Sequence, residues 1–157
     1  MTVEVVAITD ADGAVVNADL LAAAESVHRQ LRPQLPEAYV ERMKVIFAGG
    51  GRMAVALVDA KVAGITVYRI LEKTFTGREL YCDDLVTDEA RRSTGVGHAL
   101  MAHMRALCAR RGADAFTLDS GVQRDQAHKF YFREGMTVTS FHFTQVLSDR
   151  PIGLKRK

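Results

Sequence analysis

The segment from residue 85 to residue 97 constrains the fold more than any other part of the sequence. Its letters are LVTDEARRSTGVG: a β-rich stretch, a short basic loop with two glycines, and the beginning of a helix. The first turn of a helix has unpaired backbone N–H groups and the positive end of the helix dipole. Gly95 and Gly97 let an anion approach that backbone closely. The segment therefore predicts a phosphate or pyrophosphate site at a strand–loop–helix junction.

Two well-known nucleotide-binding motifs do not fit this loop. Leu100 stands where the dinucleotide pattern GxGxxG needs its third glycine. No Gly-Lys-Ser/Thr follows, so the Walker pattern fails as well. The loop does fit the pattern Arg/Gln-x-x-Gly-x-Gly/Ala, which runs here from Arg92 to Gly97.

The residue patterns on both sides of the loop predict one α/β domain with a mixed sheet flanked by helices. Closely spaced strands with turns at Asp59 and Gly77 predict an antiparallel N-terminal meander, and the later strand–helix–strand order predicts a parallel pair beside the loop. The helix behind the loop carries an apolar stripe for packing on the sheet. We expect a core over residues 3–147 and a tail over 148–157. The expected strands are 3–8, 53–58, 61–71, 79–87, 115–118 and 137–147, and the expected helices are 18–31, 37–48, 95–111 and 125–134.

A second pattern, Ala-x-x-Phe-Tyr-x-x-x-Gly-Phe/Tyr, occurs from Ala127 to Met136, with methionine replacing the last aromatic residue. Both motifs, in this element order over residues 3–147, resemble the GNAT family of N-acetyltransferases. The resemblance implies a GNAT fold and acetyl-coenzyme A as co-substrate. Residues 127–135 and 140–144 look most like members that acetylate aminoalkylphosphonates.

The resemblance also implies which residues bind the coenzyme. In the family, the strand before the loop binds the pantetheine arm through its backbone, and the loop binds the pyrophosphate. Arg124 stands where many members have an asparagine that touches the coenzyme. The expected coenzyme-binding residues are Leu85, Val86, Thr87, Arg91, Arg92, Ser93, Thr94, Gly95, Val96, Gly97, His98, Arg124, Ala127 and Lys129.

Tyr131 is the expected general acid, donating its phenol proton to the departing thiolate. The alternative is a helix tyrosine that only packs with Phe130 and Phe132. Cys82 is a second conceivable catalytic group, as an acetylated nucleophile. No histidine is placed by the sequence to activate it, so a buried strand cysteine is the favoured interpretation.

Adjacent acids are poor strand formers, so Asp83 and Asp84 suggest a functional reason for their presence. The resemblance implies a role for Asp84, because an acidic residue at its position acts in several family members, often through water, and Asp84 is the expected catalytic base. The alternatives are Asp83 as the base, or acids that face solvent or attract a cationic amine without proton transfer. Consecutive strand side chains alternate, so we expect at most one of the two to face the site. Asp83 is assigned to acceptor binding, together with Asp119 and Ser120 at the end of the following strand.

Composition narrows the range of partners. The chain has 157 residues and a formal net charge of +2, which gives little electrostatic drive toward nucleic acid. No apolar run approaches the roughly 18 residues of a membrane helix, and the N-terminus does not resemble a signal peptide. Two distant cysteines fit a cytoplasmic location, and the histidine spacing supports no metal site.

The expected activity is direct transfer of acetyl from acetyl-coenzyme A to the primary amine of a small molecule. The region 31–51 and the acidic strand should build the acceptor site. Glu37, Glu41, Asp83 and Asp84 would suit a cationic acceptor, whereas Arg32, Arg42 or Arg52 could hold a phosphonate or carboxylate, and the sequence does not choose between these. Two alternatives remain: acetylation of a protein or peptide, and a non-catalytic acyl-coenzyme A-binding module. The resemblance also leaves open a homodimer formed through the last strands.

Overall fold

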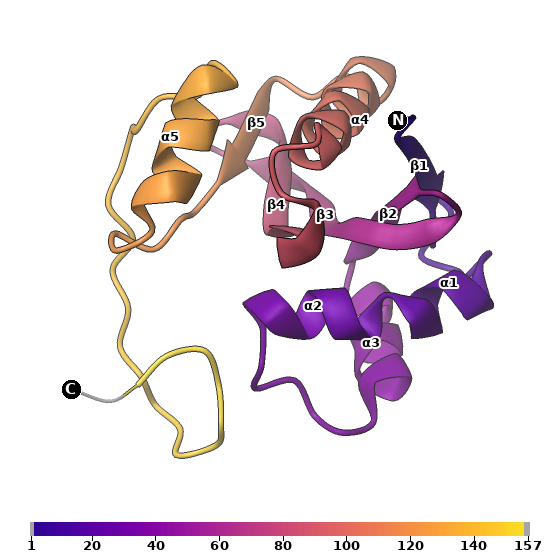
Figure 1. Cartoon of the computed structure of the whole chain (residues 1–157). Helices are drawn as coiled ribbons and strands as arrows, with labels where there is room; N and C mark the ends of the chain where they lie inside the picture. The colour runs from indigo at the N-terminus through magenta and orange to yellow at the C-terminus, as the bar shows by residue number, and fades with distance from the viewer. Residues whose placement is uncertain (1, 156–157) are drawn as a thin grey trace.

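The computed structural model describes residues 2–155. A single mixed sheet with the order β1-β2-β3-β4-β5 forms its centre (Figure 1). The first four strands pair antiparallel, and β4 pairs parallel with β5, which confirms the predicted meander and parallel pair. The strands are β1 (Glu4–Ala7), β2 (Arg52–Val58), β3 (Lys61–Lys73), β4 (Gly77–Thr87) and β5 (Ala115–Leu118).

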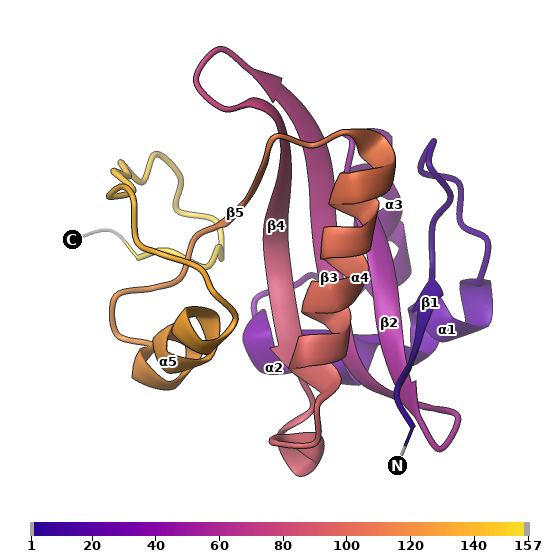
Figure 2. The same ribbon diagram turned by 90° about the horizontal axis from the view of Figure 1, so that it is seen from above.

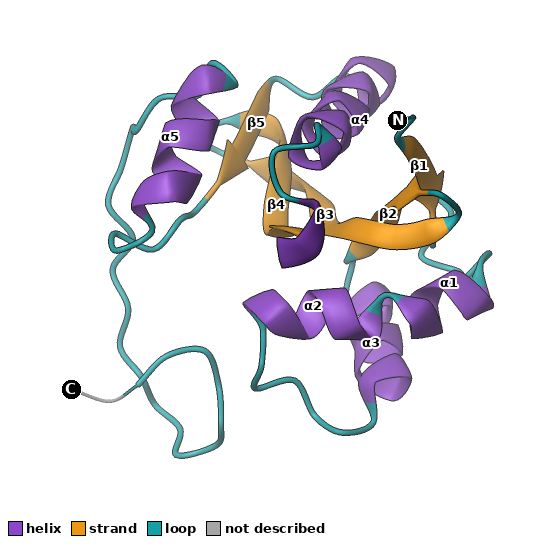
Figure 3. Cartoon of the chain, in the orientation of Figure 1, coloured by secondary structure: helices purple, strands orange, loops and turns teal. Residues whose placement is uncertain are grey.

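Helices cover both faces of the sheet (Figures 1 and 3). One face is covered by α1 (Ala18–Ala23), α2 (Glu25–Leu31) and α3 (Tyr39–Ala48), and the other by α4 (Val96–Arg111). The helix α5 (Asp125–Arg133) lies beside β5 at the end of the sheet (Figure 2). No helix within residues 2–155 is long and apolar enough to cross a membrane.

The core has one apolar cluster on the α1–α3 face and two on the α4 face. Under α1–α3, the buried side chains include Leu21, Met43 and Phe47, packed on Ile65 of the sheet. On the other face, Val96, Leu100 and Met104 of the predicted α4 stripe are buried against the sheet. Burying this stripe fixes the start of α4 relative to the end of β4.

A β-bulge in β4 separates β4 from β5. Val67 of β3 pairs with Asp84 and the next residue, Tyr68, pairs with Cys82, so Asp83 is an extra residue in β4. Pairing with β5 ends at the same point, at Cys82 and Leu118. A bulge bends its strand and increases the local twist. Beyond Cys82, β4 therefore runs on to Thr87 with no strand partner on its β5 side.

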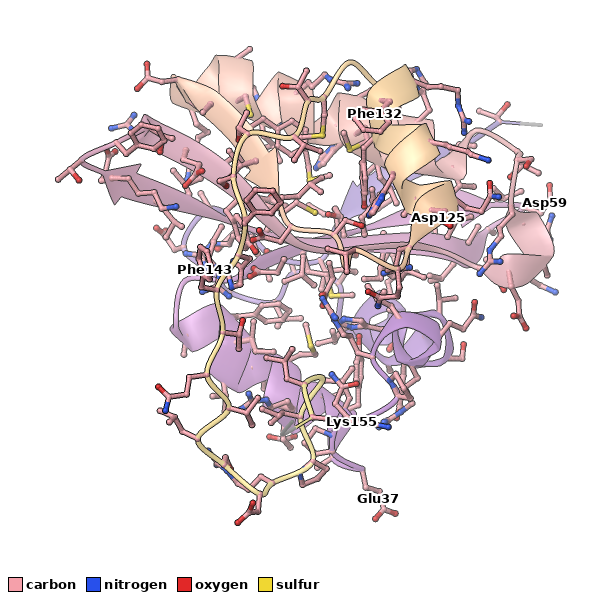
Figure 4. All side chains as sticks on the ribbon, turned by 90° about the vertical axis from the view of Figure 1, so that its left-hand side faces the viewer. Glu37, Asp59, Asp125, Phe132, Phe143 and Lys155 are labelled. Carbon is pink, nitrogen blue, oxygen red and sulfur yellow. The ribbon has the colours of Figure 1, made fainter. Side chains whose placement is uncertain are left out.

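The predicted last strand, residues 137–147, is absent from the structure. These residues form no strand pairing with any part of residues 2–155, and Phe141 and Phe143 are 83% and 93% exposed. Figure 4 shows this segment, marked by Phe143, as an extended chain beside the sheet. The alternating apolar residues favour an extended conformation, but a strand also needs a neighbour. In this structure β5 spans only four residues and offers the segment no matching edge.

Candidate active site

The loop after β4 places an open helix N-terminus beside the end of that strand. A 3-10 turn (Glu89–Arg91) follows, and the Asp88 carboxylate accepts a hydrogen bond from the Ala90 N–H at 3.2 Å. No side chain within residues 2–155 caps the N-terminus of α4. The N–H groups of the first turn of α4 are therefore available to an anion.

The structure favours glycine at the two glycine positions of the loop for different reasons. Gly95 adopts a φ of 86°, which favours glycine, and a Cβ atom there would meet no atom within 4 Å. A Cβ atom on Gly97 would lie only 3.0 Å from Cζ of Phe130 in α5. Gly95 thus leaves space at the helix N-terminus, whereas Gly97 lets α4 approach α5. The two sequence motifs meet at this contact.

A small cavity lies where β4 and β5 part. The strands contribute Cys82, Asp83, Leu85 and Leu118, and the segment after β5 contributes Asp119, Ser120 and Arg124; Leu31, Arg32 and Tyr131 complete the lining. Asp83, Asp119, Ser120 and the predicted acid Tyr131 therefore line one space, whereas Asp84 does not. A second hollow is formed only by residues of the tail between 148 and 155 and contains none of the predicted site residues.

Tyr131 faces this cavity in a mostly apolar setting. Its ring packs edge-on against Phe130 at 5.4 Å between centroids, whereas Phe132 is 57% exposed. Burial raises the pKa of Tyr131 to about 12, although the nearby guanidinium groups of Arg124 and Arg32 act in the opposite direction. The phenol is therefore protonated at neutral pH and has a proton to donate in a hydrogen bond.

The Asp84 carboxylate is held on both oxygens. Oδ2 accepts a hydrogen bond from Nε2 of His28 at 2.7 Å, and Oδ1 accepts one from Nε of Arg32 at 2.7 Å. Burial alone would raise the pKa of Asp84, but His28 and Arg32 together hold it below its usual value. Asp84 therefore stays ionised, and its contacts are with α2 and Arg32.

Asp83 is the acid that lines the cavity. Its Oδ2 accepts a hydrogen bond from Nε of Arg69 at 2.8 Å, and Oδ1 has no partner within residues 2–155. Burial raises the pKa of Asp83 by more than the Arg69 hydrogen bond lowers it. A carboxylate with a raised pKa and a free oxygen is better suited to accept a proton than Asp84 is.

Cys82 lies between these groups as a buried thiol, in agreement with the favoured interpretation. It is 3% exposed, and burial raises its pKa to about 12. A thiol in this state is a poor nucleophile because the thiolate is the reactive form.

The geometry agrees with comparisons to known proteins. The sequence model described as "Acetyltransferase (GNAT) family" matches residues 19–136, well over half of the chain. The chain belongs to the GNAT acetyltransferase family. Membership makes this protein an acyltransferase and accounts for the mixed sheet with its parallel β4–β5 pair.

Several GNAT proteins are similar to this chain. An uncharacterized N-acetyltransferase, YhdJ, of Bacillus subtilis is 27% identical over 124 residues, which cover 73% of this chain and 82% of YhdJ. An aminoalkylphosphonate N-acetyltransferase of Salmonella typhimurium is 33% identical over 64 residues, or 41% of this chain and 42% of that protein. The solved aminoglycoside N-acetyltransferase AAC(6')-Iy in complex with CoA has a TM-score of 0.78 at 16% identity, covering 93% and 95% of the two chains. This last similarity establishes the fold alone.

In this GNAT domain, the predicted coenzyme-binding residues occupy the end of β4, the loop and the start of α5. Val86 packs in the core under α1–α3, so only its backbone is available to a ligand. Arg91 lies 3.8 Å from the Asp59 carboxylate and ties the loop to the β2–β3 turn. The exposed members of this set are Arg92, Ser93, Gly95, Arg124 and Lys129. The half-buried members are Leu85, Thr87, Thr94, Gly97 and Ala127, and Val96 is buried.

Among the other predicted site residues, His98 and Asp119 contact protein groups, whereas Ser120 does not. Nδ1 of His98 lies 2.8 Å from the Glu134 carboxylate, which links α4 to the end of α5. Asp119 accepts a hydrogen bond from the Tyr81 hydroxyl at 2.5 Å. Oγ of Ser120 is buried and has no hydrogen-bond partner within residues 2–155.

The sequence interpretation did not identify His28 and Tyr39, which support Asp84 from α2 and α3. His28 is 1% exposed, and its Nδ1 lies 2.9 Å from the Tyr39 hydroxyl. One signal was present: His28 and Arg32 are four residues apart, a spacing that places both on one side of a helix. That spacing does not reveal which residue of the sheet they meet.

Proposed function

We propose that this protein transfers the acetyl group of acetyl-coenzyme A to the primary amine of a small molecule. The observation that carries the proposal is the cavity with Tyr131 and Asp83 at the parting of β4 and β5, on the strand that leads to the open N-terminus of α4. The names of two similar proteins support an amine acceptor. One is an aminoalkylphosphonate N-acetyltransferase, and the other is an aminoglycoside N-acetyltransferase.

The site fits the two ends of acetyl-coenzyme A. The first turn of α4 and the open space at Gly95 suit the diphosphate. The exposed guanidinium of Arg92 adds positive charge to the same loop. From Leu85 to Thr87, the β5 side of β4 has no strand partner, so the backbone there can pair with the pantetheine arm. The thioester would then lie at the cavity beside Tyr131.

The reaction converts an ammonium group and a thioester into an amide, a thiol and one proton. The C–N bond forms as the C–S bond breaks. Asp83 accepts the first proton of the ammonium group through its free Oδ1, and the amine then attacks the carbonyl carbon. Tyr131 gives its proton to the departing sulfur. The attacking nitrogen, which still carries one proton more than the amide retains, returns that proton to Tyr131.

The pKa of Tyr131 limits how this transfer occurs. A phenol with a pKa of about 12 is a weaker acid than a thiol, whose ordinary pKa is about 8.5. Tyr131 therefore stabilises the departing sulfur by a hydrogen bond and transfers its proton only as it receives another. Positioning of the amine against the thioester supplies much of the remaining acceleration.

Binding and turnover test this function separately. Addition of acetyl-coenzyme A should raise the thermal unfolding midpoint, because a ligand that binds only the folded protein stabilises it. Release of free thiol in the presence of a panel of small primary amines should follow. A thermal shift with no thiol release for any amine would favour the binding module, and no shift at ~1 mM coenzyme would contradict the coenzyme site.

Asp83→Asn should change the pH profile of the enzyme. Because the pKa of Asp83 is raised, acidification protonates this base at a higher pH than an ordinary aspartate, and kcat/KM of the wild type should fall there. Asp83→Asn should remove this part of the profile and lower kcat/KM at neutral pH by roughly 10- to 100-fold.

Asp84→Asn is the comparison for this experiment. The pKa of Asp84 is lowered, so its titration lies below the range in which Asp83 acts. We expect Asp84→Asn to retain the acidic fall in kcat/KM. If that fall disappears in Asp84→Asn and persists in Asp83→Asn, the base is Asp84.

A further inference from the structure

We propose that Arg32 binds an oxyanion on the acceptor, so that the natural acceptor is a small amine that also carries a carboxylate or phosphoryl group. This inference rests on the proposed function, because it assigns the acceptor class of the same cavity. The structure assigns to Asp84, His28 and Tyr39 the task of holding Arg32 in place.

Arg32 reaches the cavity with part of its guanidinium unused. It follows the last residue of α2, lines the cavity beside Asp83 and Tyr131, and its side chain is 38% exposed. Nε and Nη2 lie 2.7 and 2.6 Å from Oδ1 of Asp84, and Nη2 also donates to the backbone oxygen of Asp83 at 3.1 Å. Nη1 has no hydrogen bond to any part of residues 2–155. Its N–H groups are available to a ligand in the cavity.

A polarised chain of hydrogen bonds holds the Arg32 partner. The Tyr39 hydroxyl lies 2.9 Å from Nδ1 of His28, and burial raises the pKa of Tyr39 far above neutrality, so the phenol keeps its proton. Nε2 of His28 lies 2.7 Å from Oδ2 of Asp84. Each ring nitrogen of His28 therefore has one polar partner, and Asp84 lies between His28 and Arg32.

Stability does not explain this arrangement. When an ion pair is removed from water, the free energy lost with its hydration is about as large as the free energy gained from its attraction. The Arg32–Asp84 pair, backed by a buried histidine and tyrosine, is therefore weak evidence of a stabilising role. What the arrangement does accomplish is to fix the direction of one half-exposed guanidinium. A guanidinium in a fixed direction recognises carboxylate and phosphoryl oxygens well, through charge-assisted hydrogen bonds.

The rest of the cavity complements a molecule with both charges. Ser120 contributes a buried hydroxyl with no partner among residues 2–155, which can donate a hydrogen bond to the same oxyanion. Asp83 provides the negative charge for the ammonium group. The other two candidate arginines do not line the cavity: Arg52 donates to backbone oxygens of residues 11, 47 and 51, and Arg42 is exposed on α3.

The test compares amines that differ in charge at the far end. β-Alanine and 2-aminoethylphosphonate carry an oxyanion, whereas β-alaninamide and propylamine do not. The wild type should prefer the oxyanion amines in kcat/KM. Arg32→Gln should reduce this preference by about 10- to 100-fold, mainly through a higher KM, and Arg32→Lys should retain part of it. Arg42→Gln is the matched control and should leave the preference unchanged.

The supporting residues give a second measurement. Asp84→Asn should raise KM for the oxyanion amines more than it lowers kcat, because it loosens Arg32 without touching the amine. An equal preference for charged and neutral amines, or a preference that survives in Arg32→Gln, would overturn the inference. So would a loss of coenzyme affinity in Arg32→Gln, because Arg32 would then bind the coenzyme.

Failure of the proposed function has a different signature. Calorimetry with N-acetyl-β-alanine and its amide, on protein saturated with coenzyme A, tests the oxyanion site without turnover. Tighter binding of the acid, lost in Arg32→Gln, supports the Arg32 site even if no amine is acetylated. Equal binding of acid and amide contradicts it, whatever the activity.

Discussion

Gly95→Asp is expected to lower the affinity for acetyl-coenzyme A by at least about 100-fold while the domain still folds. The new carboxylate would lie at the open N-terminus of α4, where it would accept the first-turn N–H groups and repel the diphosphate. No atom lies within 4 Å of the position its Cβ would take, so the cost to folding is confined to the positive φ, about 1–2 kcal/mol. Calorimetric titration, with urea unfolding as the stability measurement, checks both parts.

Gly135→Asp is the matched control for this variant. Gly135 has a φ of 87°, against 86° for Gly95, and its Cβ position is equally open. It lies after α5 and outside the cavity lining. Both variants should lose similar stability, but only Gly95→Asp should lose the coenzyme. Equal coenzyme affinities in the two variants would remove the N-terminus of α4 from the binding site.

Tyr131→Phe is expected to lower kcat by about 100-fold with little change in coenzyme affinity. The substitution removes only the hydroxyl, while the ring continues to pack against Phe130 and the cluster around Cys82 and Met104. Steady-state kinetics with a good amine acceptor measures the effect. Because the pKa of Tyr131 is about 12, the wild type should show no alkaline loss of kcat from this residue below ~pH 10.

Tyr68→Phe provides the control. Tyr68 belongs to the same apolar cluster, but it does not line the cavity. Loss of its hydroxyl should leave kcat near the wild-type value. If Tyr131→Phe also turns over at the wild-type rate across the pH range, Tyr131 is a packing residue, and the thiolate takes its proton from another donor.

The two motifs are informative in the sequence because each satisfies a local requirement. Gly95 takes a positive φ at the start of α4, and the apolar stripe of α4 repeats at helical spacing. The two motifs also share a non-local requirement, since Gly97 of the first leaves room for Phe130 of the second.

The predicted strand over residues 137–147 shows the opposite case. Its alternation of apolar residues around Phe141 and Phe143 is a local property, but strand formation depends on a partner edge. Within residues 2–155, no such edge pairs with it. The same limit applies to the two aspartates. The alternation of side chains along a strand assumes regular pairing. The bulge at Asp83 interrupts that pairing at the two aspartates, so alternation does not tell which of them faces the cavity.

The sequence by itself determined the order of the elements up to α5 and the open N-terminus of α4, because φ angles, helix dipoles and hydrophobic periodicity act over a few neighbouring residues. Tertiary structure alone decided which acid faces the cavity and which acid holds Arg32. Those roles depend on the β4 bulge and on His28, which contacts Asp84 from a helix 56 residues earlier in the chain and is itself contacted by Tyr39. Contacts over such separations follow from how helices pack on the sheet, and no local pattern encodes them.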